Sequence, residues 1–136
     1  MQRTADLQVT AAIIIVDGNR FLIARKKDGK PLAGLWEFPG GKLESGELPA
    51  TGIIREISEE LNIRLEAPEE YCRYYYSTTE KTIEFIFFTA PKGHGEIVLM
   101  DHDAIAWVTT EEISSFPLAP ADEIAVDIIR KKGLPV

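Results

Sequence analysis

The pattern of hydrophobic and polar positions predicts a series of short strands interrupted by helical stretches. Residues 8–16 are rich in β-branched side chains and end at the turn cluster Asp17-Gly18-Asn19, which a second apolar run, 20–24, follows. This arrangement predicts a hairpin whose first strand is buried. Further strands are predicted at residues 71–78, 82–90, 97–100 and 104–109, the first two joined by the polar residues 79–81.

The helical pattern is clearest over residues 49–61, which begin at Pro49, a residue favoured in the first turn of a helix. A short helical segment is predicted at 110–115 and an amphipathic helix at 121–132. Residues 26–35 have the composition of a loop, and residues 36–41 predict a turn flanked by aromatic residues and containing two glycines. The order of elements predicts a mixed α/β fold in a single domain spanning residues 1–136.

The charge balance narrows the classes of function. The 136 residues include 22 acidic and 15 basic side chains, a net charge of −7. Residues 37–70 alone hold nine acids and three bases, so that nearly all of the imbalance lies in one quarter of the chain. A surplus of acid disfavours non-specific binding to a nucleic-acid backbone.

Two further features concern the cellular setting. The longest apolar run, residues 11–16, is far shorter than a membrane span or a signal peptide requires. The single cysteine, Cys72, cannot form an intrachain disulfide. We therefore expect a cytoplasmic monomer or homodimer that binds neither membranes nor nucleic acid.

Three glutamates share one face of the predicted helix 49–61. Helical periodicity places Glu56, Glu59 and Glu60 together, beside the sector that holds the apolar side chains. Carboxylates this close repel each other, and no lysine lies between them. The face is either an acidic surface exposed to solvent or a site for a hard cation, Mg²⁺ or Mn²⁺, that bridges to phosphate oxygens.

Neighbouring residues favour the cation site. Arg55 lies one turn before Glu59 and can hold that carboxylate in one rotamer. Gly52 occupies a helix-interior position where glycine costs about 1 kcal/mol relative to alanine. Its small size is explained if the preceding loop, which carries Gly41 and Glu47, packs over it.

The spacing of these residues resembles the Nudix box, Gly-x5-Glu-x7-Arg-Glu-U-x-Glu-Glu-x-Gly-U, where U is aliphatic. The matching residues are Gly41, Glu47 and the run Arg55-Glu56-Ile57-Ser58-Glu59-Glu60-Leu61-Asn62-Ile63. Only the final glycine differs, being Asn62. Asparagine is the residue that best replaces glycine in a left-handed helix cap, so we expect this change to leave the metal site intact.

The resemblance extends beyond the box to most of the chain. Residues 36–42 are similar to the corresponding segment of MutT-type Nudix proteins, and residues 116–122 resemble the C-terminal segment of the family's bacterial CTP pyrophosphohydrolases. The fold that the resemblance implies is an α/β/α sandwich with a mixed β-sheet.

The resemblance also implies a reaction, in which a metal-activated water attacks an internal phosphorus of a nucleotide. The implied Mg²⁺ ligands are Glu56, Glu59, Glu60 and the carbonyl of Gly40. Arg55 and Glu47 would orient these glutamates. The proton of the water would pass to Glu56 or to a later group.

Asp101 is a candidate for that later group. MutT-type enzymes carry an acid six residues before a tryptophan, as Asp101 precedes Trp107 here. The alternative is an ordinary surface turn. We expect its neighbour His102 to be a solvated histidine and not a base.

Four residues are assigned to substrate binding through the resemblance: Arg25, Glu37, Phe38 and Asp122. Asp122 occupies the position of a base-reading asparagine in MutT-type proteins. An ionised carboxylate only accepts hydrogen bonds, which favours a base edge with N–H donors, as in guanine. Cytosine would fit best if Asp122 were protonated or a backbone group helped. One or two rings from residues 74–76 and 85–88 are expected to stack on the base.

The leading hypothesis is a Mg²⁺-dependent enzyme that hydrolyses nucleoside triphosphates to a monophosphate and pyrophosphate. Its substrates would be oxidised nucleotides such as 8-oxo-dGTP, giving a role in nucleotide pool sanitation, or CTP-type nucleotides. One alternative is a hydrolase of ADP-ribose or of a dinucleotide polyphosphate. Another is a non-catalytic nucleotide-binding module, although members of that kind usually lose a carboxylate of the box and none is missing here.

Overall fold

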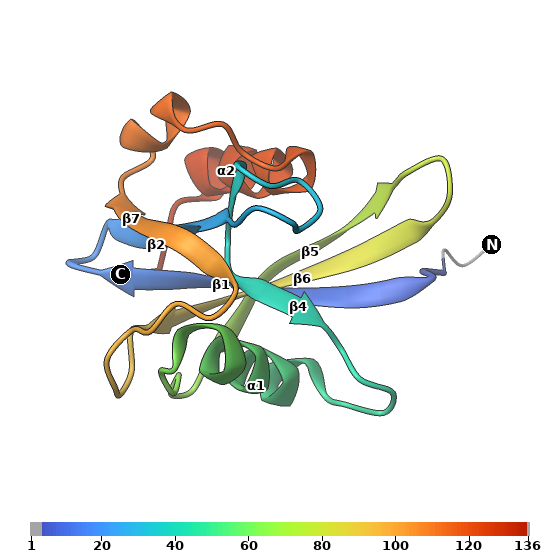
Figure 1. The fold of residues 1–136 in the computed structure, drawn as a ribbon, viewed down its shortest axis with the longest axis horizontal. Helices are drawn as coiled ribbons and strands as arrows, with labels where there is room; N and C mark the ends of the chain where they lie inside the picture. Colours follow the sequence, from blue (N-terminus) through green and yellow to red (C-terminus); the bar gives the residue numbers. More distant parts are fainter. Residues whose placement is uncertain (1–3, 136) are drawn as a thin grey trace.

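The computed structural model describes residues 4–135 and forms a mixed sheet between two helices (Figure 1). In chain order the elements are β1 (Leu7–Val16), β2 (Arg20–Lys26), β3 (Trp36–Glu37), β4 (Gly40–Lys42), α1 (Pro49–Leu61), β5 (Glu69–Ser77), β6 (Thr82–Pro91), β7 (His102–Val108), the 3₁₀ helix η1 (Glu112–Ser115) and α2 (Pro120–Lys132).

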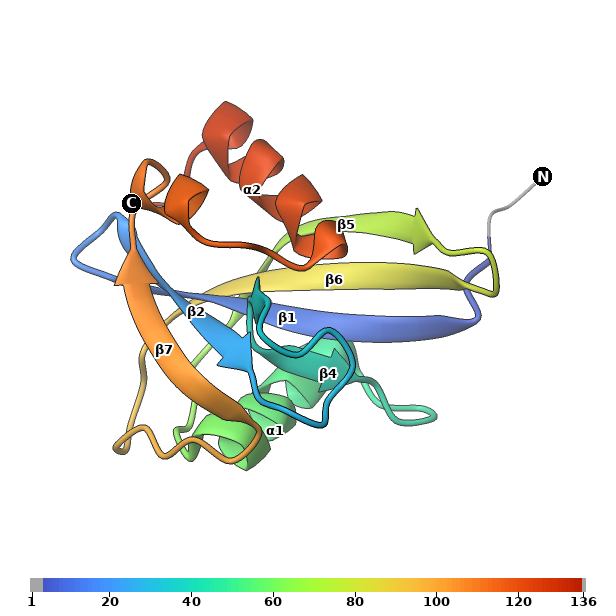
Figure 2. The ribbon, with the colours of Figure 1, turned by 45° about the horizontal axis from the view of Figure 1, so that its top comes forward.

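Strand β1 is the centre of the sheet. It runs parallel to β6 over residues 7–15 and antiparallel to β4 at its beginning and to β2 at its end. Strand β5 continues the sheet beyond β6, while β3 and β7 both pair with β2 (Figure 2). Strands β4 and β2 pair with the same edge of β1, one near its beginning and the other near its end. The chain that connects β2 to β4 therefore lies beside the middle of β1.

Two hydrophobic cores lie on opposite faces of this sheet. One is formed under α1 by side chains that include Ile14, Leu22 and Ile57, and the other lies under α2 and includes Ile13, Phe21 and Val126. Successive residues of β1 and β2 thus point to opposite cores, as the alternation of a strand requires. The expected α/β/α sandwich is confirmed.

Most predicted elements are present, with two differences. Residues 97–100 were expected to form a strand, and this prediction is wrong: the Val98 amide donates to the carbonyl of Leu61 at 3.0 Å and the Met100 amide to that of Glu60 at 3.1 Å. These amides therefore satisfy the free carbonyls at the end of α1 and not a sheet. Residues 36–41, predicted as a turn, instead contribute β3 and the start of β4.

Among residues 4–135 the structure contains no helix with the length and apolar character needed to cross a bilayer.

Candidate functional site

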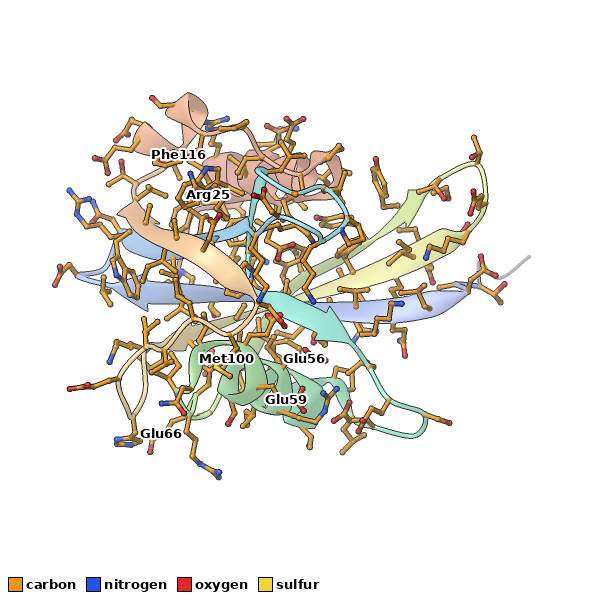
Figure 3. The ribbon with its side chains drawn as sticks, viewed as in Figure 1. Arg25, Glu56, Glu59, Glu66, Met100 and Phe116 are labelled. Atoms are coloured by element: carbon orange, nitrogen blue, oxygen red, sulfur yellow. The ribbon has the colours of Figure 1, made fainter. Side chains whose placement is uncertain are left out.

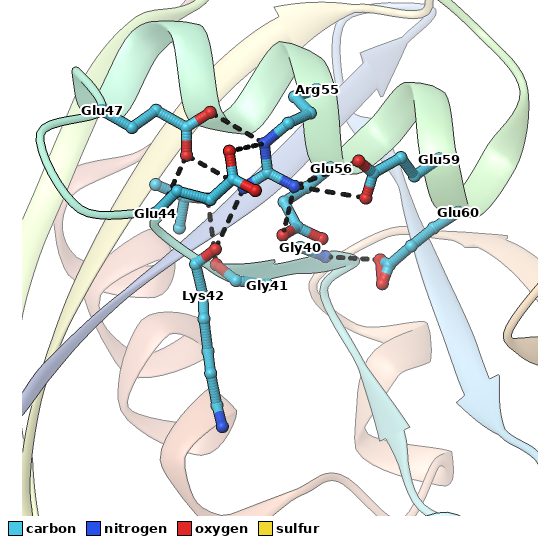
Figure 4. Close-up of polar contacts among 10 residues, drawn as sticks. Gly40, Gly41, Lys42, Glu44, Glu47, Arg55, Glu56, Glu59 and Glu60 are labelled. Carbon is cyan, nitrogen blue, oxygen red and sulfur yellow. Dashed lines mark hydrogen bonds and ion pairs between the residues drawn. The ribbon is translucent and has the colours of Figure 1, made fainter.

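Helix α1 presents its glutamates toward the short strand β4 (Figure 4). Its apolar residues Ile53, Ile57 and Leu61 are completely buried, which fixes the rotation of the helix about its axis. The helix begins with a proline in its first turn and ends at Asn62, whose φ of 62° and ψ of 24° are left-handed. The expectation that asparagine takes the place of the box glycine in this cap conformation is confirmed.

The Arg55 guanidinium organises the carboxylates around it. It binds Glu47 bidentately, with Nε 2.7 Å from Oε2 and Nη2 2.9 Å from Oε1. Its Nη1 lies 3.0 Å from Oε1 of Glu56 and 3.2 Å from both carboxylate oxygens of Glu59. It also donates to the carbonyl of Lys42 at 3.1 Å. One planar cation therefore fixes three carboxylates of the box in defined rotamers.

These contacts shift the pKa values of Glu47 and Arg55. Hydrogen bonds from Arg55, followed by the amide of Glu44, lower the pKa of Glu47 from 4.5 to about 2. The same bond to Glu47 raises the pKa of Arg55. Glu47 thus remains ionised and Arg55 charged.

Glycines allow β4 and the following loop to approach α1. A Cβ atom at Gly52 would collide with Cδ2 of Leu43 and lie 3.1 Å from Oε1 of Glu47. A Cβ atom at Gly41 would collide with the carboxylate of Glu56. The expectation that the loop carrying Glu47 packs over Gly52 is confirmed.

Glu60 differs from the other glutamates of the helix because Arg55 does not reach it. It is only 8% exposed, and its Oε1 accepts a hydrogen bond of 3.1 Å from the amide of Gly40. Burial, together with the negative charges of Glu37 and Glu56, raises the pKa of Glu60 from 4.5 to about 8. Burial also raises the pKa of Glu56, against the opposing effect of Arg55.

This donor set suits a hard divalent cation. Within residues 4–135 no three acidic, histidine or cysteine side chains already converge as a complete metal cluster, since Glu56 and Glu59 turn toward Arg55 and Glu60 toward Gly40. Within the part of the chain that the structure describes, the buried Glu60 carboxylate nevertheless has no cationic partner. Oxygen ligands without histidine or cysteine match the preference of Mg²⁺ or Mn²⁺.

A pocket of about 510 Å³ begins at Glu60 and extends across the sheet to the start of α2. Glu37, Gly40, Gly41 and Asp101 line it near Glu60, and Asp122 lines its other end. The lining also includes residues that were not among the predicted site residues, namely Val9, Lys26, Lys30, Leu32, Lys42, Thr78, Ile83 and residues 119–121. The sequence gave a signal for some of them, since Lys42 and residues 119–121 belong to the two segments that resemble the family outside the box, and Lys26 follows Arg25.

Asp122 is buried in the first turn of α2. It is 5% exposed, and its Oδ2 accepts a hydrogen bond of 3.2 Å from the amide of Phe38. Burial, and then the charge of Glu37, raises the pKa of Asp122 well above its usual value. Tyr76 and Phe85 stand on the neighbouring wall of the pocket, where the sequence predicted that one or two rings would face a base.

Only some of the predicted substrate-binding residues line the pocket. Glu37 and Asp122 line the pocket, whereas the Phe38 side chain is buried between Phe21 and Phe87, so that only its backbone amide reaches the site. Arg25 is absent from the pocket lining. It lies over the Trp36 ring and binds Asp103 at 2.6 Å, on the α2 side of the sheet away from α1 (Figure 3).

Residues 101 and 102 have different environments. The Asp101 side chain is 48% exposed, lines the pocket and has its Oδ1 3.6 Å from Nζ of Lys30. His102 was expected to be solvated, and this prediction is wrong: its side chain is 2% exposed and its Nε2 lies 2.8 Å from Oε2 of Glu37. Since β7 places residue 102 beside Lys26 of β2, the sheet covers the imidazole.

Comparison with known proteins agrees with the box. The NUDIX domain family matches residues 6–131. The chain is 36% identical over 116 residues to the CTP pyrophosphohydrolase of Escherichia coli, covering 85% of each protein. It is 26% identical over 125 residues to the 8-oxo-dGTP diphosphatase of the same species, covering 92% of this chain and 97% of the relative.

Solved structures show the same fold. The MutT NUDIX hydrolase of Burkholderia pseudomallei superposes with a TM-score of 0.77 at 29% identity, over 89% of this chain and 95% of that one. With every carboxylate of the box present, its buried helix face and these relatives, the chain belongs to the NUDIX family and is a Nudix hydrolase.

Proposed function

We propose that this Nudix hydrolase cleaves nucleoside triphosphates to a nucleoside monophosphate and pyrophosphate with the help of Mg²⁺ or Mn²⁺. The observation that carries the proposal is the single pocket that joins the Glu60 end of the carboxylate helix to the buried Asp122. Such a pocket can hold a charged polyphosphate at one end and a planar base at the other. Relatives named CTP pyrophosphohydrolase and 8-oxo-dGTP diphosphatase support this class of substrate.

The polyphosphate end would be assembled by α1 and β4. Glu56, Glu59, Glu60 and the Gly40 carbonyl would hold the divalent cation, which when bound neutralises phosphate charge and lowers the pKa of water. Arg55 holds two of these glutamates beside β4, and binding of the cation would turn their carboxylates from Arg55 toward the metal.

Proton transfer has two candidate acceptors. Glu56 has a raised pKa and a carboxylate enclosed between Gly41 and Arg55. Asp101 is more exposed and approaches the same end of the pocket from the segment before β7. We favour Asp101 as the acceptor of the proton from the attacking water, because Arg55 already engages Glu56.

The base end would be read by Asp122. Its raised pKa favours the neutral acid, which can donate as well as accept a hydrogen bond. With Oδ2 bound to the Phe38 amide, the other oxygen can face a base edge that pairs a donor with an acceptor. Cytosine and oxidised guanine both offer such an edge, and removal of modified nucleotides from the cytoplasmic pool would be the biological role.

The test is turnover of a panel of ribo- and deoxynucleoside triphosphates that includes 8-oxo-dGTP. ADP-ribose and a dinucleotide tetraphosphate are assayed beside them, and the products of each reaction are identified. We expect pyrophosphate from the triphosphates, and loss of at least about 100-fold in kcat for Glu59→Gln and Glu60→Gln. Glu80→Gln, in the exposed β5–β6 turn, is the matched control and should retain full activity.

Three outcomes would contradict the proposal. Preferred cleavage of ADP-ribose or the dinucleotide would identify a different substrate class. Nucleotide binding without turnover in either metal would indicate a non-catalytic module. Unchanged turnover in both glutamine variants would place the metal site elsewhere.

A further inference from the structure

A second polar cluster lines the pocket outside the Nudix box. The carboxylate of Glu37, in β3, has Oε2 2.8 Å from Nε2 of His102 and Oε1 3.5 Å from Nζ of Lys26. These residues come from three neighbouring strands, and the irregularity of β2 between Arg25 and Lys26 lies where Lys26 is paired with His102. Irregularities of this kind commonly re-aim side chains near functional sites.

The burial of His102 requires an explanation. Its side chain is 2% exposed, and its Nδ1 has no hydrogen-bond partner among residues 4–135. The imidazole thus keeps its proton on Nε2, which donates to the Glu37 carboxylate. An apolar side chain would fill the same space without leaving a buried nitrogen unsatisfied, so the bond to Glu37 is the feature that histidine provides.

Glu37 lies in the pocket near both Glu60 and Asp122. The amide of the next residue, Phe38, binds Asp122, and the amide of Gly40 binds Glu60, so the segment 38–40 connects the proposed base end of the pocket to the proposed metal end. Consistently, the negative charge of Glu37 contributes to the raised pKa values of both Glu60 and Asp122. A nucleotide that fills the pocket would place its sugar beside this carboxylate.

The chemistry of the carboxylate restricts what it can bind. Each oxygen already has one cationic or N–H partner, and each retains a lone pair for a further donor. A phosphate would be repelled, whereas a neutral hydroxyl can donate. Resting on the proposed function, we infer that Glu37 accepts a hydrogen bond from a sugar hydroxyl of the nucleotide, and that His102 is a positioning residue that holds Glu37 for this contact.

The experiment compares sugars on one base. Steady-state kinetics are measured for CTP, dCTP and 2′,3′-dideoxy-CTP, with the guanine series alongside. The variants are His102→Gln, whose amide nitrogen can replace the Nε2 donor, and His102→Leu, which removes it. Glu37→Leu removes the acceptor directly and serves if His102→Leu does not fold. His94→Leu is the matched control, since His94 forms an exposed pair with Glu66 at 2.6 Å outside the pocket.

We expect the parent enzyme to lose about ten-fold or more in kcat/KM, mainly through KM, at the step that removes the contacted hydroxyl. The ribo-to-deoxy and deoxy-to-dideoxy steps identify which hydroxyl this is. In His102→Leu and Glu37→Leu the ratio of kcat/KM between substrates with and without that hydroxyl should fall toward one. In His102→Gln this ratio should be largely restored, and in His94→Leu it should match the parent.

Distinct results would overturn the inference. A parent that cleaves all three sugars equally would show that Glu37 contacts no hydroxyl. A His102→Leu protein that is slower on every substrate with an unchanged ratio would make His102 a purely structural residue. A parent that cleaves no triphosphate would instead overturn the proposed function, and the sugar assignment with it.

Discussion

Replacing Glu60 with glutamine should remove the pH dependence that this residue imposes on stability. Glu60 is 8% exposed, and its pKa is raised from 4.5 to about 8, first by burial and then by Glu37 and Glu56. Glutamine keeps the size of the side chain, and its carbonyl can still accept the hydrogen bond from the Gly40 amide. The substitution therefore removes the ionisable group while preserving the packing.

The sign follows from proton binding. Between a pH of 4.5 and about 8 the folded protein holds a proton on Glu60 that the unfolded chain has released, so the free energy of unfolding falls as the pH rises. The loss attributable to Glu60 amounts to roughly 4 kcal/mol between about pH 5 and about pH 9. Glu60→Gln should gain stability relative to the parent by a comparable amount over that interval.

The assay is urea unfolding of the parent, Glu60→Gln and the exposed control Glu80→Gln across this pH range, first with EDTA and then with millimolar Mg²⁺ or Mn²⁺. A cation that binds the ionised Glu60 should stabilise the parent and flatten its dependence on pH, with little effect on Glu60→Gln. Parallel curves for parent and Glu60→Gln in EDTA would refute the reasoning. Absence of any stabilisation by either metal would show that the acidic face does not bind a cation.

Three other substitutions test the arrangement around α1. Arg55→Lys should lower kcat by about 10- to 100-fold in the presence of Mg²⁺, because one ammonium cannot keep the bidentate bond to Glu47 and also orient two further carboxylates; unaltered kcat would contradict that role. Gly41→Ala should lower kcat at least about ten-fold by displacing Glu56, with a smaller change in the midpoint of urea unfolding. Asn62→Ala should reduce the free energy of unfolding by about 1 kcal/mol while Asn62→Gly should not, since the left-handed cap is strained for alanine; equal stabilities would argue against this cap.

The sequence predicted the parts of the site that depend on local periodicity. The spacing of Glu56, Glu59 and Glu60 on one helix, and the need for a small residue at position 52, follow from about 3.6 residues per turn and short-range packing. The structure agrees because α1 is anchored by apolar residues at the same period. Residues 97–100 were mispredicted because their short apolar run carried no information on the end of α1, whose carbonyls accept hydrogen bonds from the amides of Val98 and Met100.

Burial of polar groups could not be inferred in the same way. Asp122 meets the Phe38 amide across 84 positions of the sequence, and His102 meets Glu37 across 65. The contact of His102 depends on the register with which β3 and β7 join β2, and that of Asp122 on the backbone bonds between Trp36 and residues 117 and 119, neither of which the sequence pattern determines. The displacement of Arg25 from the pocket has the same origin, since pairing with β3 and β7 directs it to Trp36 and Asp103.

The structure shows how the acidic side chains that give the chain its uneven charge are paired. Arg55 is the cation shared by Glu47, Glu56 and Glu59, while Glu60, one turn after Glu56, has among residues 4–135 only the backbone amide of Gly40 as a hydrogen-bond donor. The pKa of Glu47 falls to about 2 while that of Glu60 rises to about 8, although both belong to one motif. An acidic surface in solvent would not produce this division. The arrangement keeps the orienting residues permanently charged and leaves the pocket-facing carboxylate short of positive charge, so that a divalent cation arriving with a polyphosphate would relieve the deficit at the position where phosphate charge must be neutralised.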